Sequence, residues 1–406
     1  MKIRSITCFV NPRWPLDESI LALAGEFITN ATSEFTSAGY EVQTTRIATI
    51  PYPHLLPSVD IDLLLELARS LESAAMSLGF DYVSLGPGLP EFPRSYSVIP
   101  SVLASTCDVF LAGLITTPGG GVSMSAVRLC AEVIHQTATL SPDGFANLRF
   151  AALANVPPGA PFFPAAYHLG DDLTFAIATE AADLAVNAFD NTPSLESGRQ
   201  VLINSIEMHA GKLNRVANRL TSHYPLTFSG IDFTLAPFPQ EALSFGTAME
   251  RLGLPAVGLH GSLAAAAILT DTLDRARYQR TGFNGLMLPV LEDTILAKQA
   301  AEGKLSIKDL LLYSTVCGTG LDTVPLPGEA TVEQIYAILL DLAVLSQRLD
   351  KPLTARLMPI PGKKAGDLTS FDFAYFANSR VLNIEAEPLG DKLAGGETFF
   401  LKKLQK

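Results

Sequence analysis

Clustered positive charge is missing from this sequence. The 406 residues include 29 Lys and Arg against 41 Asp and Glu, for a net charge of −12, and no four basic residues occur in a row. Its densest basic pair, Lys402 and Lys403, is expected in a solvated tail. Nucleic-acid binding depends on clustered Lys and Arg that neutralise phosphates. The composition therefore predicts no nucleic-acid partner.

Cysteine pairs and a leader segment are missing as well. The four cysteines lie far apart, with no CxxC pair and no Cys/His spacing typical of zinc sites. Cys8, Cys107 and Cys130 lie in apolar stretches, which predicts small buried core residues. The first residues contain no apolar segment followed by a small-residue cleavage site. We therefore expect a cytoplasmic protein.

Long hydrophobic runs are scarce. The uncharged stretch 252–270 reaches the length of a membrane span, but Pro255, Gly258 and Gly261 interrupt it. A short loop followed by an Ala-rich helix is the better interpretation, so no membrane partner is predicted. Charged residues make up only 17% of the chain and apolar residues 48%. A chain this poor in charge must bury much of its surface, which predicts a large core and a homodimer or higher homo-oligomer.

Buried strands and helices alternate along the chain. The periodicity predicts a helix at 173–188, and the Gly- and Pro-rich composition of 317–328 predicts a loop. Strands are predicted at 3–10, 41–47, 82–85, 109–115, 150–156, 226–235, 285–290 and 354–360. Near-continuous apolar strands separated by helices predict an α/β fold. Its mostly parallel sheet, covered on both sides, would be open or closed as a barrel. We expect one domain over 1–406, with possible pseudo-halves 1–190 and 191–406.

A glycine-rich loop follows one of these strands. In TTPGGGVS, residues 116–123, Gly119, Gly120 and Gly121 would let the backbone approach a ligand. Free N–H groups at the start of the next helix favour an anion. The alternative is a tight strand-to-helix turn with no ligand.

The loop CGTGLDTVPLPG, residues 317–328, carries a second group of candidates. Cys317 is a nucleophile candidate if a base lowers its pKa. Asp322 is the stronger candidate, as a base, a metal ligand or a hydrogen-bond acceptor, because it lies between apolar neighbours. Thr319 and Thr323 are candidate ligand-binding residues beside it.

An arginine inside an apolar strand forms the third group. Arg356 needs a carboxylate or phosphate partner there. Lys363 and Lys364 follow in the loop at the carboxyl end of that strand, the usual ligand-binding edge of parallel sheets. Together these residues predict a carboxylate or phosphate on the ligand. The alternative is that Arg356 pairs with an internal Asp or Glu while both lysines are solvated.

Two further polar residues are candidates for catalysis. Asp232 lies in a strand-like stretch, where an ionised side chain is costly without partners. His260 lies between Gly258 and Gly261 and is the histidine we most expect to be functional, although a structural histidine is commoner. Glu207 and His209 are two residues apart on a predicted helix, so they cannot chelate one ion together.

Several segments together resemble a known family. The chain is similar over nearly its whole length to the family numbered 711 among the domains of unknown function, through GYEVQTTRIAT (39–49), GIDFTLAPFP (230–239), GFNGLMLPVLED (282–293), VCGTGLDTVPLPG (316–328) and ARLMPIPGKKAGDLTSFDFAYFANSRV (355–381). That family is similar in fold to the pyruvate formate-lyase and ribonucleotide-reductase barrels. The resemblance implies a barrel-like sheet with a loop inside it, and it makes the Cys317 loop a candidate for that inner position.

The residues do not support the radical chemistry of those barrels. Glycyl radical enzymes carry Arg-Val-x-Gly-aromatic near the C-terminus, whereas residues 380–384 here read RVLNI. The adjacent cysteine pair of pyruvate formate-lyase is also missing. We therefore expect no glycyl radical.

The leading hypothesis is an enzyme of lyase or hydrolase type that acts on a small carboxylated or phosphorylated metabolite. Arg356, Lys363 and Lys364 would hold the anion, with help from the loop 119–121. Asp322, with His260 or Asp232, would transfer protons or bind a divalent cation. The alternative is a metabolite-sensing or regulatory protein that binds the same anion without chemistry.

Overall fold

The computed structural model describes residues 1–190 and 192–404, and its centre is a sheet of nine strands. Asn191, at which the second pseudo-half was predicted to begin, lies outside the described residues. The strand order is β8-β7-β1-β2-β3-β4-β6-β10-β9. The strands are β1 (Lys2–Val10), β2 (Thr45–Thr49), β3 (Tyr82–Gly88), β4 (Val109–Leu114), β6 (Phe150–Ala154), β7 (Thr174–Glu180), β8 (Thr227–Ala236), β9 (Gly320–Pro327) and β10 (Leu353–Ile360). A separate two-stranded sheet pairs β5 (Gly121–Ser123) with β11 (Thr398–Phe400).

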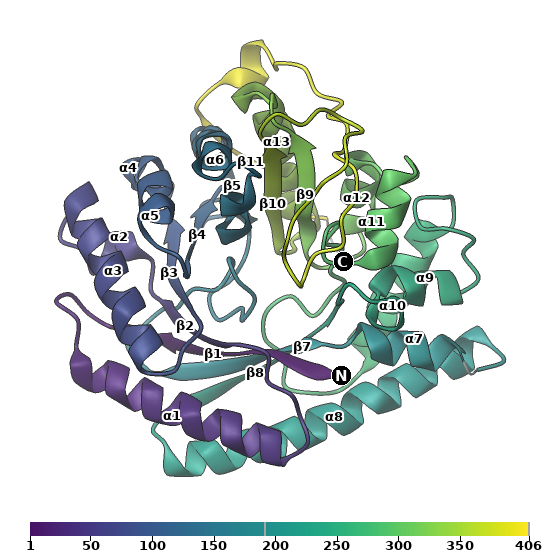
Figure 1. The fold of residues 1–406 in the computed structure, drawn as a ribbon, viewed down its shortest axis with the longest axis horizontal. Coiled ribbons are helices and arrows are strands. Elements are labelled where there is room, and N and C mark those ends of the chain that lie inside the picture. Colours follow the sequence, from purple (N-terminus) through teal and green to yellow (C-terminus); the bar gives the residue numbers. More distant parts are fainter. Residues whose placement is uncertain (191, 405–406) are drawn as a thin grey trace.

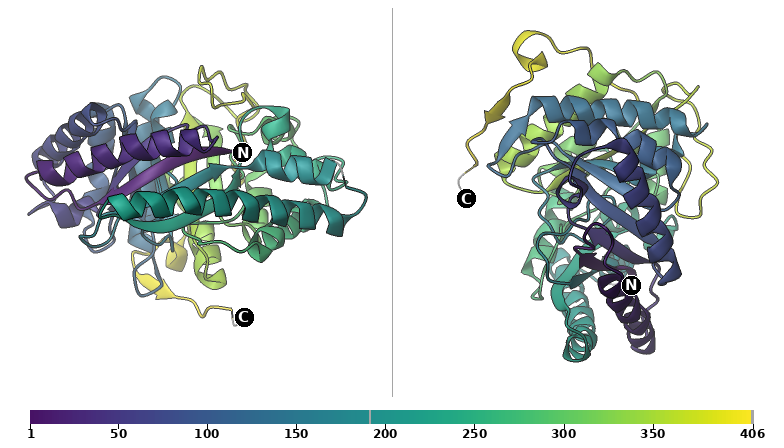
Figure 2. Two further views of the ribbon diagram at one scale, coloured as in Figure 1. Left: turned by 90° about the horizontal axis from the view of Figure 1, so that it is seen from below. Right: turned by 90° about the vertical axis from the view of Figure 1, so that its left-hand side faces the viewer.

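The sheet is mostly parallel and strongly curled. Strands β1, β2, β3, β4 and β6 run in one direction, and the pairs β7–β8 and β10–β9 flank them in the opposite direction. The helices surround the outer face of the curl (Figures 1 and 2). The predicted mostly parallel sheet surrounded by helices is thus confirmed.

The sheet does not close into a barrel. Its edge strands β8 and β9 are not paired with each other, and the segment 279–291 lies against both. Isolated bridges join Arg280 to Ile231 of β8 and Pro289 to Asp322 of β9. The strand predicted at 285–290 is therefore an irregular segment. The first residues of the segment 279–291, up to Gly285, contact β8, and Pro289 and Val290 near its end contact β9.

Thirteen helices lie among the described residues. Several begin at side chains that accept hydrogen bonds from free backbone N–H groups, such as Asp17 before α1 and Thr331 before α13. The bounds are α1 (Glu18–Ser37), α2 (Tyr52–Leu55), α3 (Ile61–Ser77), α4 (Arg94–Ser97), α5 (Ile99–Ser105), α6 (Met124–Thr137), α7 (Ala182–Asp190), α8 (Leu195–His223), α9 (Phe245–Arg251), α10 (Ser262–Arg275), α11 (Thr294–Ala301), α12 (Ile307–Ser314) and α13 (Val332–Leu349).

Two elements differ from the sequence predictions. The helix expected at 173–188 is β7 followed by α7, because a strand buried on both faces shows no alternation and its Ala-rich sequence mimics a helix. The loop expected at 317–328 is largely β9. Pro325 and Pro327 suggested a loop, but an edge strand tolerates proline because part of its backbone has no ladder partner.

No helix in the described part of the chain is both long and apolar enough to cross a membrane. The cytoplasmic location and the homo-oligomeric state stay predictions.

Asp232 anchors the irregular segment to β8. Its carboxylate is fully buried and accepts hydrogen bonds from the backbone N–H groups of Phe283 (2.7 Å) and Asn284 (2.9 Å) and from the Thr234 hydroxyl (2.6 Å). Burial raises the pKa of Asp232 to about 6, so the side chain is still ionised at neutral pH. Gly282 lies so close that a Cβ there would be 2.2 Å from Asp232 Oδ2. Asp232 thus has a complete set of structural partners.

Replacing Asp232 with Asn should destabilise the protein. The amide NH₂ would face backbone N–H donors, which leaves buried groups unsatisfied at a cost of about 1–3 kcal/mol. Urea unfolding at pH 7.5 measures the change, with E329Q as a control because Glu329 is exposed. Equal stability of D232N and E329Q would contradict the anchoring role.

Candidate functional site

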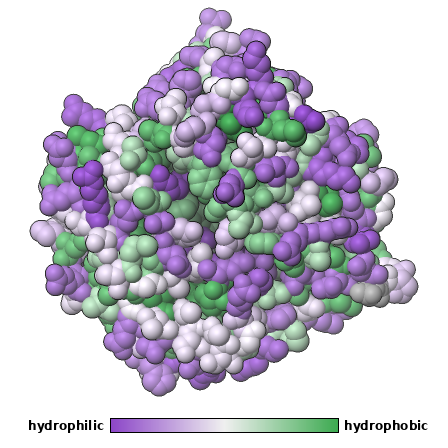
Figure 3. All heavy atoms as spheres, in the orientation of Figure 1, coloured by the Kyte–Doolittle hydropathy of each residue, from purple (hydrophilic) through white to green (hydrophobic). Residues whose placement is uncertain are grey.

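A cavity of about 80 Å³ lies at one end of the curled sheet. The face seen in Figure 1 is hollowed near its centre, with hydrophobic side chains along the depression (Figure 3). Aromatic, apolar and charged side chains share the wall: Arg4, Gln43, Thr44, Arg46, Tyr82, Phe110, Leu148, Phe162, Phe163, Met287, Glu292, Asp322, Arg356, Phe373 and Tyr375. Such a mixture of apolar walls with a few convergent polar groups is typical of ligand sites.

The cavity lies at the amino ends of the central parallel strands. Arg4, Arg46, Tyr82 and Phe110 are each among the first three residues of β1, β2, β3 and β4 respectively. The opposite wall comes from the strands that run the other way, which contribute Asp322 of β9 and Arg356 of β10. The cavity therefore lies at the opposite end of β1–β4 from the carboxyl ends, which are the usual ligand-binding edge of parallel sheets.

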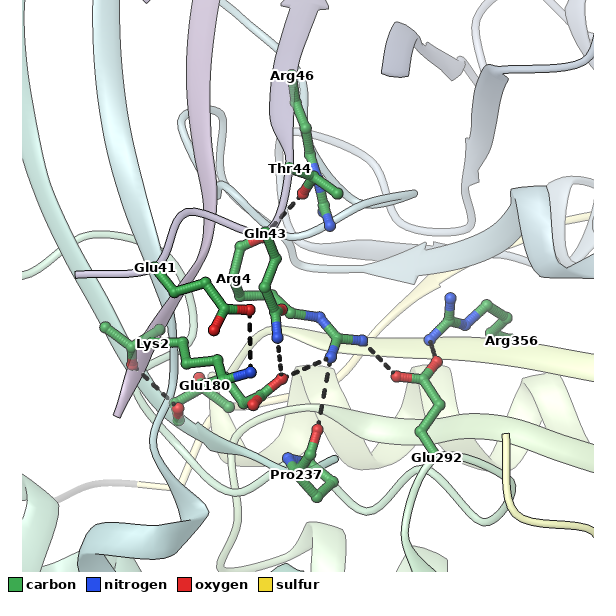
Figure 4. Close-up of polar contacts among 12 residues, drawn as sticks. Lys2, Arg4, Glu41, Gln43, Thr44, Arg46, Glu180, Pro237, Glu292 and Arg356 are labelled. Carbon is green, nitrogen blue, oxygen red and sulfur yellow. Dashed lines mark hydrogen bonds and ion pairs between the residues drawn. The ribbon is translucent and has the colours of Figure 1, made fainter. Parts of the chain in front are cut away.

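A chain of ion pairs crosses one side of the cavity. Arg356 donates to Asp322 Oδ1 (2.6 Å) and to Glu292 Oε1 (2.7 Å). Arg4 donates to Glu292 Oε2 (2.7 Å) and to Glu180 Oε2 (3.4 Å), and Figure 4 shows the contacts of Glu292 with both arginines. These ion pairs connect β1, β7, β9 and β10 with Glu292, the residue that follows the segment 279–291. All five side chains are 13% exposed or less. We call these five residues the charge network.

Burial sets the protonation behaviour of this network. It raises the pKa of Asp322, although the Arg356 guanidinium acts against the shift. It also raises the pKa of Glu180, with Arg4 opposing. For Arg356, burial alone would lower the pKa, but Asp322 and Glu292 outweigh it and the net shift is upward. Asp322 and Glu180 are thus easier to protonate than exposed carboxyl groups, while Arg356 is held as a cation.

Arg46 stands apart from the charge network. It is buried, and its Nε donates to Thr44 Oγ1 (2.9 Å). Its guanidinium stacks over Phe163, with 5.0 Å between the guanidinium carbon and the ring centroid. No carboxylate of the described residues forms an ion pair with Arg46. The two terminal nitrogens of Arg46 also make no hydrogen bond to any described residue. Burial, with Arg4 and Arg356 nearby, lowers the pKa of Arg46, although Tyr82 and the Glu292 carboxylate act against the shift. An anion in the cavity would relieve this unfavourable position.

The segment inside the curl is not the one expected. Residues 155–168, between β6 and β7, pack against the inner face of the sheet and bring Phe162 and Phe163 into the cavity wall. Their backbone carbonyls accept hydrogen bonds from Thr7 of β1 and Ser84 of β3. Cys317 instead precedes β9 and is buried in the main hydrophobic core.

Only some of the predicted site residues meet at the cavity. Asp322 and Arg356 lie in its wall, and Thr319 lines a smaller adjoining cavity of about 20 Å³ that shares both of them. Thr323 is buried on β9, and its Oγ1 accepts from Leu291 N at 3.4 Å. Arg356 has the internal carboxylate partners that the alternative interpretation required.

The other predicted residues lie elsewhere. Gly119, Gly120 and Gly121 follow β4, whose amino end lines the cavity, so this loop lies at the opposite end of the sheet. There a Cβ on Gly121 would be 2.6 Å from Thr398 of β11, so the C-terminal strand covers the position. Lys363, partly buried, and Lys364, exposed, lie in the loop after β10 and do not line the cavity. His260 is exposed before α10.

The donor set at Asp322 does not suit a metal ion. Among the described residues no group of three or more His, Cys, Asp or Glu side chains could hold a metal ion. The groups next to Asp322 are the Arg356 guanidinium and Glu292, which Arg356 and Arg4 already bind.

Sequence reasoning missed Arg4, Gln43, Arg46 and Glu292. A single polar residue near the start of a strand is common in proteins, so the local sequence around these four residues does not indicate a site. The segments that carry the family resemblance do contain them, except Arg4: Gln43 and Arg46 lie in 39–49 and Glu292 in 282–293. Listing the polar residues of those segments would have found most of the site.

Several curated proteins are similar to this chain. A UPF0210 protein of Pyrobaculum aerophilum is 33% identical over 349 residues, which is 81% of this chain and 76% of that protein. UPF0210 proteins of Pyrobaculum islandicum and Syntrophobacter fumaroxidans are 32% and 30% identical, over 81% and 88% of this chain and 76% and 82% of their own lengths. The model of a family described as "Uncharacterised ACR (DUF711)" matches residues 1–378.

Removing a member of the charge network should lower the free energy of unfolding. E292Q replaces the carboxylate that Arg4 and Arg356 share with a neutral amide, while Glu180 and Asp322 still pair with the two arginines. Hydrogen bonds to charged groups contribute about 1.5–3 kcal/mol each, so we expect a loss of that size. E41Q is the matched control, because its partner Lys2 and Glu41 itself are 34% and 60% exposed and such pairs contribute about 0–1 kcal/mol. Urea unfolding compares the two, and equal losses would rule out a structural role for the network.

The cysteines give a simple test of the packing. Cys8, Cys130 and Cys317 are buried, whereas Cys107 is exposed, so its prediction as a core residue is wrong. It follows α5, where the chain turns at the surface, and it lines an open groove that shares Tyr82, Phe110 and Phe373 with the cavity.

We expect one thiol to react rapidly with a thiol reagent in the native protein and four in denaturant, with none reacting rapidly in C107S. A second rapid thiol in C107S would contradict the packing.

Proposed function

The chain belongs to the family described as Uncharacterised ACR (DUF711), and from that premise we propose that its cavity binds a small carboxylated or phosphorylated metabolite. The observation that carries the proposal is Arg46, a buried guanidinium in the cavity wall with no carboxylate partner among the described residues. Buried guanidinium groups need an anionic partner, and a carboxylate or phosphate fits two terminal nitrogens in a bidentate manner.

The position of Arg46 suits this task. Thr44 fixes Nε and Phe163 supports the flat face of the guanidinium, so the group is held before a ligand arrives. A preorganised group loses little conformational entropy on binding. Aromatic side chains around Arg46 make its surroundings less polar than water, which strengthens the attraction between unlike charges. These features favour Arg46 over Lys363 and Lys364 as the anion-binding residue.

For an enzyme of lyase or hydrolase type, Asp322 is the group we propose for proton transfer. It lines the cavity, and the upward shift of its pKa moves it toward the range in which a carboxyl group can donate as well as accept a proton. Arg356 would hold one of its oxygens in place. Asp232 and His260 have no part in this proposal, because one is saturated with structural partners and the other is exposed.

A metabolite-sensing protein is the second candidate. The observation that favours it is that Arg4 and Arg356 already bind Glu292 and Asp322, and none of the cavity-lining residues is a Cys, Ser or His. Ligand binding without turnover would support this candidate.

The fold likeness to the pyruvate formate-lyase barrels also remains a proposal. Its support is the arrangement of five parallel strands flanked by strands of opposite direction, with the segment 155–168 against the inner face. We propose chemistry without a glycyl radical, because RVLNI replaces the glycine and aromatic residues that a radical site needs.

A thermal-shift screen with small carboxylates and phosphates tests the binding proposal. A ligand at 100 times its Kd stabilises the protein by about 2.7 kcal/mol, which raises Tm measurably. In R46M the affinity should fall at least about 30-fold, because truncating one partner of a buried charge pair costs about 2 kcal/mol or more. R219M is the control, since Arg219 is exposed. Unchanged affinity in R46M, or no response to any anion, would overturn the proposal.

A further inference from the structure

We infer that the ligand is a small amino acid or a similar zwitterion, with its carboxylate on Arg46 and its ammonium toward Asp322. This inference rests on the proposed function and names the ligand class of the same cavity. It begins with the distribution of charge, which differs between the two sides of the cavity.

The charge network carries more carboxylates than guanidinium groups. Glu180, Glu292 and Asp322 share only Arg4 and Arg356, so one negative charge remains when all are ionised. Arg46 carries the opposite charge alone. A cavity with a negative excess on one wall and a guanidinium without an ion-pair partner on another is complementary to a ligand that carries one charge of each sign. A plain carboxylate would neutralise Arg46 and leave the negative excess.

Two acceptors in the wall also lack donors. Asp322 accepts from Arg356 through Oδ1, while its Oδ2 receives no hydrogen bond from the described residues. Gln43 donates its Nε2 to Glu180 (2.7 Å), and its buried Oε1 has no partner among the described residues. A reversed amide would set Oε1 against a carboxylate, so the hydrogen bond to Glu180 fixes the orientation. An ammonium group offers the donors that Asp322 Oδ2 lacks, whereas Gln43 Oε1 is closed to solvent and does not face a ligand in the cavity.

The aromatic walls fit the remainder of such a ligand. Tyr82, Phe110, Phe163, Phe373 and Tyr375 line the cavity. Their faces attract cations, as the stacking of Arg46 over Phe163 and of Arg4 over Tyr375 already shows. They would accommodate an ammonium and an apolar side chain, and they offer little to a second carboxylate or a phosphate. The cavity of about 80 Å³ limits the ligand to a small one.

Calorimetric titration of the full chain at pH 7.5 with matched probes tests the inference. Each series contains an amino acid, the same molecule without its amine, and the same molecule without its carboxylate. The series are alanine, propionate and ethylamine; leucine, 4-methylpentanoate and 3-methylbutylamine; and phenylalanine, 3-phenylpropionate and 2-phenylethylamine. In at least one series we expect the zwitterion to bind at least about tenfold more tightly than either analogue.

Two variants test which residue binds each charged group of the ligand. In R46M both the zwitterion and the carboxylate should lose affinity, whereas D322N should weaken the zwitterion and leave the carboxylate unchanged. R219M is again the control, and unfolding curves check that each variant is folded. The comparison of probes on the unmodified chain does not depend on the variants.

The outcomes separate this inference from the proposal on which it rests. If carboxylates bind as tightly as their amino acids, the zwitterion inference is overturned while the anion site stands. If no amino acid or carboxylate binds but phosphates do, the ligand class is again wrong. If no anion of any kind binds, both fail.

Discussion

The structure depends on the pairing of buried charges that four strands and the residue after the segment 279–291 bring together. Arg4 and Arg356 each bind two carboxylates, so β1, β7, β9, β10 and the residue after the segment 279–291 must be in position at once. Any one of these groups left alone would be a buried, uncompensated charge. The network therefore stabilises the curled sheet across the gap between β8 and β9, where no regular strand pairing does so.

The same network determines what the cavity can bind. Because the network's carboxylates are bound by Arg4 and Arg356, Arg46 has no ion-pair partner among the described residues, and its terminal nitrogens donate no hydrogen bond to that part of the chain. Aromatic side chains on β3, β4 and the segments 155–168 and 371–376 enclose the space around it. The fold thus provides a fixed cation, a negative wall and apolar surroundings within one small cavity, which is why binding of a small acid is the function that we propose.

Much of the fold can be predicted from the sequence, because its elements are long and strongly patterned. The strand from Ile3, the helix capped by Asp17 and the helix from Val332 lie where periodicity and capping place them. The errors occur where local pattern and environment disagree. The prolines of β9 suggest a loop and the alanines of β7 suggest a helix, yet edge position and burial on both faces decide the outcome.

The site is harder to predict, because it depends on contacts between residues far apart in the chain. Asp322 and Arg356 stand out as charges inside apolar stretches, and both line the cavity. Arg46 and Glu292 do not stand out in the sequence. Nothing in their local sequence indicates that Glu292 has ion-pair partners or that Arg46 has none among the described residues. The glycine loop 119–121 has the composition of a ligand loop, but the direction of β4 places it at the far end of the sheet.

The most direct test of the account is a crystal structure of the protein soaked in bromide, whose anomalous scattering locates bound anions. The account predicts a bromide in the cavity, in contact with the terminal nitrogens of Arg46, while the ion pairs of Arg4 and Arg356 stay intact. A cavity without bromide, together with a protein carboxylate bound to Arg46, would contradict it.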